Sequence, residues 1–311
     1  MTKNSPMHED RQLDLFLGEL LAPASKDDIG SMEHPLFSIK KGGDRKVRRY
    51  EHRSYFLEVV PSVKGSATIW DKDILIYLFS LMRQSLDRGK GVPDEFEVSA
   101  ADLLRAIQRS DSGRDYDELV AGLERLRGTN ITTNIPTGLE HDNEENFAAG
   151  FSLLSDFQVL RDKKTKRLTR LIFKPSSWFT RQVFAKHLLT LDARYFSITS
   201  GIERRLYELA RKHCGDQAHW FIGLDTLRRK IGVTRELRKF RSEFRAAISA
   251  GGGVLRVIDY ACAMDAKDIV HVFSSNPKGR SALATYLLSV RDTTETTHEL
   301  EASIDSGDRL E

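Results

Sequence analysis

The fold is decided by the stretch WFIGLDTLRRKIGVTRELRKFRSEFRAAI, residues 220–248. Its beginning is typical of a strand, and two helical patterns follow, separated by a turn that contains Gly232 and Thr234. Helical spacing places the apolar residues of the second pattern on one narrow face, which must be buried: Leu237, Phe240, Phe244 and Ile248. Two further strand patterns, at 254–260 and 269–273, complete the order of a winged helix, whose helix-turn-helix reads the major groove of DNA.

An earlier block of the chain repeats this order at a constant offset of 124 residues. Seven apolar positions match, namely Phe96, Val98, Leu103, Ile107, Tyr116, Val120 and Ile131 against Trp220, Ile222, Leu227, Ile231, Phe240, Phe244 and Leu255. Chance can explain part of this agreement, but the order of elements matches as well. We therefore expect an α+β protein with two tandem winged-helix domains related by internal duplication, at 36–174 and 175–280, between flexible acidic ends at 1–35 and 281–311.

Charge is distributed unevenly along the 311 residues, whose formal net charge is +3. Residues 1–35 carry a net −4 and residues 291–311 a net −5, so the body between them carries +12. A basic body between acidic ends favours a polyanionic partner, nucleic acid above all. A solubilising surface with disordered ends is the alternative that charge alone leaves open.

The second helix of the quoted stretch separates its charges by face. Between Asp225 and Arg245 there are eight basic and three acidic residues, and the face opposite the apolar one carries no acid. Arginine bonds guanine edges and both basic side chains neutralise phosphate, whereas a merely solvated face would mix the two signs. The predicted DNA-binding residues here are Arg228, Arg229, Lys230, Arg235, Arg238, Lys239, Arg241, Ser242 and Arg245.

The corresponding helix of the first block has a different character. Segment 101–121 carries a net −2, and Asp117, Ala121 and Glu124 face outward, so it would repel phosphate. We expect this domain to dimerise or to touch DNA elsewhere. A candidate wing is the basic turn between two strands that contains Lys163, Lys164, Lys166 and Arg167, although a charged hairpin tip that protects a strand edge explains it equally well.

A short peptide near the N-terminus, Gln12-Leu13-Asp14-Leu15-Phe16, resembles the motif by which bacterial proteins bind the DNA polymerase sliding clamp. It lies in a polar, acidic segment, so its apolar side chains have no obvious core to fill and could become ordered on binding. An amphipathic helix that docks on the protein's own body is the alternative.

Taken together, the chain resembles the plasmid replication initiator protein A family from about Pro35 to Ser275. The resemblance is clearest in DRKVRRYE, residues 44–51, and IWDKDIL, residues 69–75. It implies binding to repeated sequences at a plasmid origin, local opening of double-stranded DNA, recruitment of host proteins including the initiator ATPase and replicative helicase, and a role in copy control. It also implies a homodimer or a monomer–dimer equilibrium, with these groove-facing residues in the C-terminal domain: Arg235, Arg238, Lys239 and Arg245. A dimeric winged-helix repressor or autoregulator is the alternative.

Catalytic and membrane signals are absent from the sequence. There is no GxxxxGK[ST] phosphate loop and no convincing nucleophile, so we expect no catalytic residues and no enzyme such as a nickase. His213, Cys214 and His219 lack zinc-site spacing, so we expect no metal and no cofactor. The sequence has only two cysteines, Cys214 and Cys262, which fits a reducing compartment. It also lacks an apolar run of about 18 residues and a secretory signal, so we expect the protein in the cytoplasm.

Replacing Leu15 and Phe16 by alanine should abolish capture of the sliding clamp and leave DNA binding intact, because the two side chains are expected to fill the apolar subsite of the clamp. Surface plasmon resonance on immobilised clamp, with DNA binding measured in parallel, checks this. Clamp binding that survives the double substitution would show that the peptide has been misinterpreted.

Overall fold

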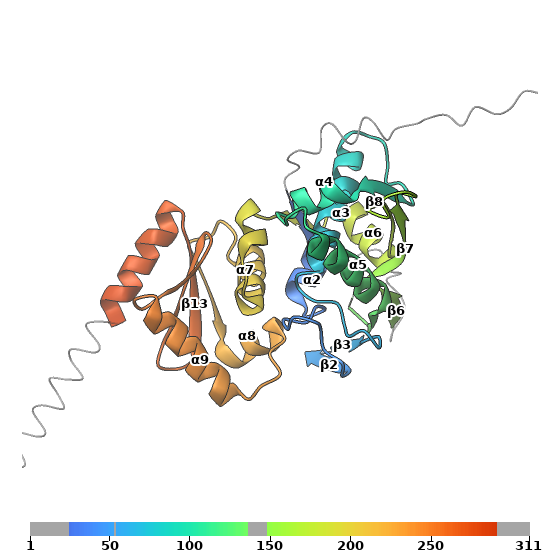
Figure 1. Cartoon of the computed structure of the whole chain (residues 1–311). Helices are drawn as coiled ribbons and strands as arrows, with labels where there is room; N and C mark the ends of the chain where they lie inside the picture. The colour runs from blue at the N-terminus through green and yellow to red at the C-terminus, as the bar shows by residue number, and fades with distance from the viewer. Residues whose placement is uncertain (1–24, 53, 136–147, 291–311) are drawn as a thin grey trace, which may run out of the picture. The chain divides into compact units, whose positions relative to one another are not determined.

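The computed structural model describes residues 25–52, 54–135 and 148–290, so the clamp-like peptide lies outside the described residues. The chain forms two compact units (Figure 1). The first comprises the residues up to Arg205 together with Lys230–Gly232, and the second comprises Leu206–Arg229 together with the residues from Val233 onwards. Both combine helices with antiparallel sheets, which makes the protein α+β. None of the helices in these ranges is long and apolar enough to cross a membrane.

The first unit contains three antiparallel sheets, with the strand orders β2-β3-β5-β6, β4-β8-β7 and β1-β9. Its elements are β1 (Lys26–Asp28), α2 (Ile29–Glu33), β2 (Arg48–His52), β3 (Tyr55–Val60), α3 (Lys72–Asp87), β4 (Phe96–Ser99), α4 (Ala100–Ala106), α5 (Gly113–Gly128), β5 (Asn130–Thr133), β6 (Ala149–Ser152), β7 (Leu154–Arg161), β8 (Leu168–Pro175), α6 (Ser177–Phe184), β9 (Leu188–Thr190) and the 3-10 helix η1 (Ala193–Ser197).

Helix α3 is the central helix of this unit, since 12 of its 16 residues are buried. Such a helix must be covered on all sides by other elements. The helices that cover it begin at serine caps: each side chain accepts a backbone N–H from the first turn, at Ser99, Ser112 and Ser176.

The division between the units lies later in the chain than the expected boundary between 174 and 175. The reason is aromatic packing by α6. Trp178 stacks on Phe151 with ring centroids 4.9 Å apart, and Phe179 lies 5.0 Å from Phe79 of α3. These contacts make α6 part of the first core.

Three consecutive charged residues at the start of α3 are buried: Asp71, Lys72 and Asp73. The ammonium of Lys72 lies 2.7 Å from the carboxylate of Asp27 in β1, and both side chains are 0% exposed. Arg125 of α5 binds Asp71 through two nitrogens, at 2.7 and 2.6 Å. Arg204 donates to Asp73 at 2.6 Å. The start of α3 is thus joined by ion pairs to segments distant in the sequence.

The second unit is built on one four-stranded sheet with the order β10-β13-β12-β11. Its elements are α7 (Gly201–His213) from Leu206 onwards, β10 (His219–Gly223), α8 (Leu224–Ile231) up to Arg229, α9 (Leu237–Ala250), β11 (Leu255–Val257), β12 (Tyr260–Met264), β13 (Ile269–Ser274) and a helix over 277–290. The acidic tail was expected from residue 281, but the helix continues to 290 because Leu283, only 8% exposed, packs on Ala261 and Phe273 of the sheet.

When β5 and β6 of the first unit and β11 of the second are set aside, the same order of strand, two helices and hairpin occurs in both units: β4-α4-α5-β7-β8 and β10-α8-α9-β12-β13. In the first unit β8 lies between β4 and β7, and in the second unit β13 lies between β10 and β12, so the last strand of the series has the same position in both sheets. The gapless alignment fails at its end, however. Ile131 pairs with β3 in a separate sheet, whereas Leu255 pairs with β12. The expected strand 254–260 is divided between β11 and β12, and residues 151–160 of the first unit likewise belong partly to β6 and partly to β7.

Replacing Lys72 by methionine should lower the free energy of unfolding by about 3–5 kcal/mol, because Asp27 would be left buried without its cation. The double variant Lys72→Met with Asp27→Leu should recover much of that loss, since it removes both charges. Urea unfolding followed by circular dichroism measures both values. A loss below about 1 kcal/mol for the single variant would mean that this ion pair is not required.

Candidate nucleic-acid interface

Helix α9 has one buried and one exposed face, as its sequence predicted. Phe240, Phe244 and Ile248 are buried, with the two phenylalanine rings 5.7 Å apart, whereas Leu237 at the start of the helix is only half-buried. Arg238, Lys239 and Ser242 are exposed. Neither Arg238 nor Lys239 forms an ion pair with any residue in the described part of the chain. These two cations are therefore available to an external anion.

The other basic side chains of α9 are paired with carboxylates. Arg241 lies 2.6 Å and Arg245 3.2 Å from Asp268, in the turn between β12 and β13. Arg235, before the helix, lies 3.0 Å from Glu243. Because these pairs are only partly buried, a phosphate group can compete for the arginines. Asp268 thus joins the hairpin turn to the basic helix.

The three predicted residues of α8 all form contacts with other residues of the chain. Arg228 donates to the Asp225 carboxylate at 2.9 Å and to the carbonyl of Arg235 at 3.0 Å, which holds the turn between the two helices. Arg229 is half-exposed and lies 3.3 Å from Asp225. Lys230 pairs with Glu33 in the first unit, and burial lowers the pKa of its ammonium. Arg228 and Lys230 are therefore only partly exposed and are paired within the chain, and their contact with DNA stays a prediction.

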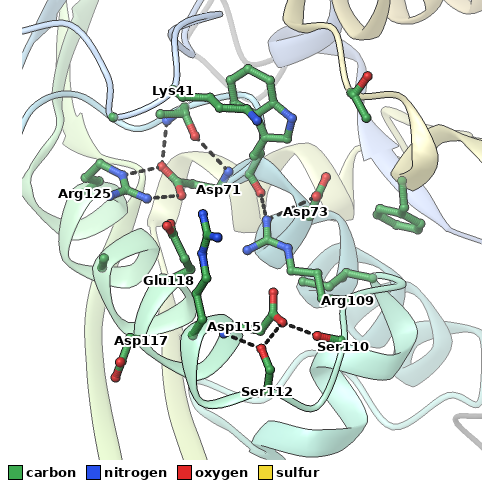
Figure 2. Close-up of a pocket in the computed structure, with 18 of the residues that line it drawn as sticks. Lys41, Asp71, Asp73, Arg109, Ser110, Ser112, Asp115, Asp117, Glu118 and Arg125 are labelled. Atoms are coloured by element: carbon green, nitrogen blue, oxygen red, sulfur yellow. Dashed lines mark hydrogen bonds and ion pairs between the residues drawn. The ribbon is translucent and has the colours of Figure 1, made fainter.

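In the first unit a cleft of about 1190 Å³ runs along α5 (Figure 2). Its lining includes five cations and five carboxylates: Lys41, Arg109, Arg114, Arg125 and Arg204, with Asp71, Asp73, Asp115, Asp117 and Glu118. The outward residues of α5, Asp117 and Ala121, lie in this lining. Carboxylates at such positions repel phosphate, so the interpretation that α5 does not read DNA remains our prediction.

The N-terminus of α5 is occupied by the chain's own carboxylate. The hydroxyls of Ser110 and Ser112 donate to Asp115, and these bonds hold the pKa of Asp115 below its ordinary value (Figure 2). A helix N-terminus attracts anions, and here Asp115 already supplies the negative charge. An external phosphate would have to displace it.

The candidate wing of the first unit is the turn between β7 and β8. All four of its predicted DNA-binding side chains are exposed: Lys163, Lys164, Lys166 and Arg167. Asp162 shapes the turn by accepting the backbone N–H groups of Lys164 and Thr165 at 3.0 and 2.7 Å. The basic side chains project from a defined turn, which is compatible with contact to a phosphate backbone.

The histidines and cysteine considered for a metal site are engaged otherwise. The ring of His213 stacks on Trp220 with centroids 4.8 Å apart, and burial lowers its pKa to about 4. Burial also raises the pKa of the Cys214 thiol to about 11. His219 lies 3.0 Å from His271. Within the described ranges no group of three or more His, Cys, Asp or Glu side chains could hold a metal ion.

Sequence reasoning missed the pairing of Asp268 with α9. The signal was weak: DAKD, residues 265–268, reads as a hairpin turn, and only the folded sheet brings its last residue to the helix. The same limit applies to Lys230 and Glu33, which are nearly 200 residues apart in the sequence.

Comparison with known proteins places this chain in a family. Residues 26–252 match the family described as Replication initiator protein A, and the chain belongs to that family. A curated relative from Wigglesworthia glossinidia brevipalpis, named "Putative replication protein", is 33% identical over 225 residues, which cover 72% of this chain and 80% of the relative.

Two solved structures share the fold. One, of domains 2 and 3 of RctB as selenomethionine derivatives, has a TM-score of 0.57 at 16% identity and covers 77% of this chain and 94% of its own. A second structure of RctB domains 2–3 has a TM-score of 0.53 at 15% identity and covers 80% and 98%.

Replacing Asp268 by alanine should strengthen binding to duplex DNA of any sequence and make it more salt-dependent, because Arg241 and Arg245 lose their carboxylate. Loss of the partly exposed pairs should itself lower the free energy of unfolding by less than about 1 kcal/mol. Alanine at the positive φ of Asp268 should add to that loss. Fluorescence anisotropy across a salt series measures the effect.

The matched control is Asp216→Ala, which removes the same charge from a fully exposed position of the same unit. An identical response of the two variants would show that only net charge matters and that Asp268 does not regulate the arginines of α9.

Proposed function

We propose that the protein is a plasmid replication initiator whose second unit binds repeated sequences at the plasmid origin through α9. The observation that carries the proposal is the exposed, charge-sorted face of this helix, on which Arg238 and Lys239 have no carboxylate partner among the described residues. Arginine and lysine so placed can bond base edges in the major groove as well as phosphate. Membership of the replication initiator family supports this assignment.

In this proposal each unit contains a winged helix, and the two arose by duplication. The turn between β12 and β13 is the wing of the second unit, and the turn between β7 and β8 is that of the first. The repeated order of elements and the common position of the last strand in each sheet support the proposal. The balanced charges of the α5 cleft favour dimerisation as the main role of the first unit.

Initiation would then be non-enzymatic. Binding free energy at the origin opens the adjacent duplex, and host proteins supply the ATP-driven steps. The sliding clamp is the proposed partner of residues 12–16, and the initiator ATPase and replicative helicase are further proposed partners. A dimeric repressor could use the same face of α9, but it would not need the clamp. Clamp capture therefore distinguishes the two functions.

Fluorescence anisotropy on duplex fragments that tile the DNA around the protein's own gene tests the central step. One repeated fragment should bind tightly, and Arg238→Ala should weaken that binding by about 1–3 kcal/mol if it contacts a base. Lys239→Ala should weaken all fragments more evenly if it contacts phosphate.

The control variant is Arg280→Ala, which removes an exposed arginine from the helix at 277–290 of the same unit and should leave the preference unchanged. Uniformly weak binding to every fragment, or a preference that Arg238→Ala and Lys239→Ala leave intact, would refute α9 as the DNA-reading helix.

A further inference from the structure

Two loops of the first unit, residues 40–46 and 62–66, pack tightly against each other. The N–H of Ser66 donates to the carbonyl of Asp44 at 2.9 Å, and the N–H of Asp44 donates to the Ser66 hydroxyl at 3.1 Å. Gly43 packs so closely that a Cβ atom there would lie 2.0 Å from the Ser66 carbonyl oxygen. We call this pair of loops the double loop.

The double loop is held in place by Arg48, the first residue of β2. Its buried guanidinium donates to the carbonyl oxygens of Pro35, Leu36 and Phe37 at 3.2, 3.0 and 3.4 Å. It also lies 3.4 Å from the carboxylate of Asp44. An arginine with this many partners fixes the chain around it, so the side chains of the loop project from a defined backbone.

The double loop is strongly basic. Its twelve residues contain five basic side chains and one acidic one, a net +4. All five basic residues are exposed, namely Lys40, Lys41, Arg45, Lys46 and Lys64. The segment from 225 to 245 carries a net +5 over a longer stretch of chain.

Part of this charge has no partner in the chain. Lys40 bonds Asp44 at 2.9 Å and Lys64 pairs with Glu124 at 2.5 Å. Arg45 and Lys46 form no ion pair with any residue that the structure describes. Like charges at this density repel one another, and a polyanion relieves the repulsion.

We propose that the double loop is a second DNA contact, which binds the phosphate backbone of duplex DNA without regard to sequence. Flexible lysine and arginine side chains on a loop suit phosphate oxygens, whereas reading of bases requires an element that enters a groove. The inference rests on the proposed function for its ligand, and it assigns to the first unit a DNA contact separate from the β7–β8 turn.

The double variant Arg45→Ala with Lys46→Ala tests the proposal by anisotropy with two duplexes, the preferred fragment and one of arbitrary sequence. Binding to both should weaken by the same factor. The slope of log affinity against log salt should fall by about 1.8, at about 0.9 for each lost phosphate contact. The matched control, Arg88→Ala with Lys90→Ala, removes one arginine and one lysine beyond the other end of α3 and should leave the slope unchanged.

The outcomes separate this inference from the function it rests on. If the salt slope is unchanged in the loop variant while Arg238→Ala loses the preference for one site, the double loop is not a DNA contact. The proposal that α9 reads DNA then stands. An equal fall in the loop variant and its control also overturns the double loop, because net charge alone would then explain the effect. If the salt slope falls in the loop variant while Arg238→Ala leaves site preference unchanged, the double loop is supported as a DNA contact. The proposal that α9 reads DNA is then refuted.

A second test locates the contact on the protein. Both native cysteines, Cys214 and Cys262, are buried, so a thiol introduced at the surface can be labelled selectively. The variant Lys46→Cys offers an exposed thiol for an iron chelate that generates hydroxyl radicals. Bound to duplex DNA, this conjugate should cleave the strands close to the double loop, whereas the Lys90→Cys conjugate should not. Absence of cleavage from a Lys46→Cys conjugate that still binds DNA would overturn the proposal.

Discussion

Buried charge at the start of α3 constrains the whole first unit. Asp71, Lys72 and Asp73 lie out of water, and a buried charge persists only beside a partner that satisfies it. The partners come from β1, from α5 and from Arg204, so all of these segments have to be in place together. Apolar replacements for such pairs are often neutral or stabilising. We therefore interpret this cluster as a device that specifies one arrangement of elements more than as a source of stability.

The two units use a common order of elements for different electrostatic purposes. Along α5 the charges cancel within a cleft, and Asp115 occupies the start of the helix. Along α9 the carboxylates bind some arginines and leave Arg238 and Lys239 to the solvent. A free cation on a helix opposite its buried face is what contact with a groove requires. The difference between these two helices is the physical basis for the proposal that the second unit recognises DNA.

Features that depend on local periodicity could be predicted from the sequence. The buried face of α9, the serine cap of α4 and the α+β class all follow from spacing and cap residues. Features that depend on distant partners could not. Periodicity does not reveal that Lys230, a predicted DNA-binding residue, lies beside Glu33. Nor does it reveal that Ile131 and Leu255, which match in the alignment, lie in sheets that do not correspond. The sequence of residues 44–51 and 69–75 indicates the family, but the burial of Arg48 and Asp71 depends on partners that only the fold brings together.

The central claim is that α9 determines which DNA sequence the protein prefers. Selection of bound duplexes from a randomised pool, with the full-length protein and with Arg238→Lys, tests it most directly, because lysine keeps the charge but loses the bidentate geometry of arginine. The account predicts a defined sequence for the native protein and relaxed choice at one base pair for the variant. Identical selected sequences from both proteins, or no selected sequence at all, would contradict it.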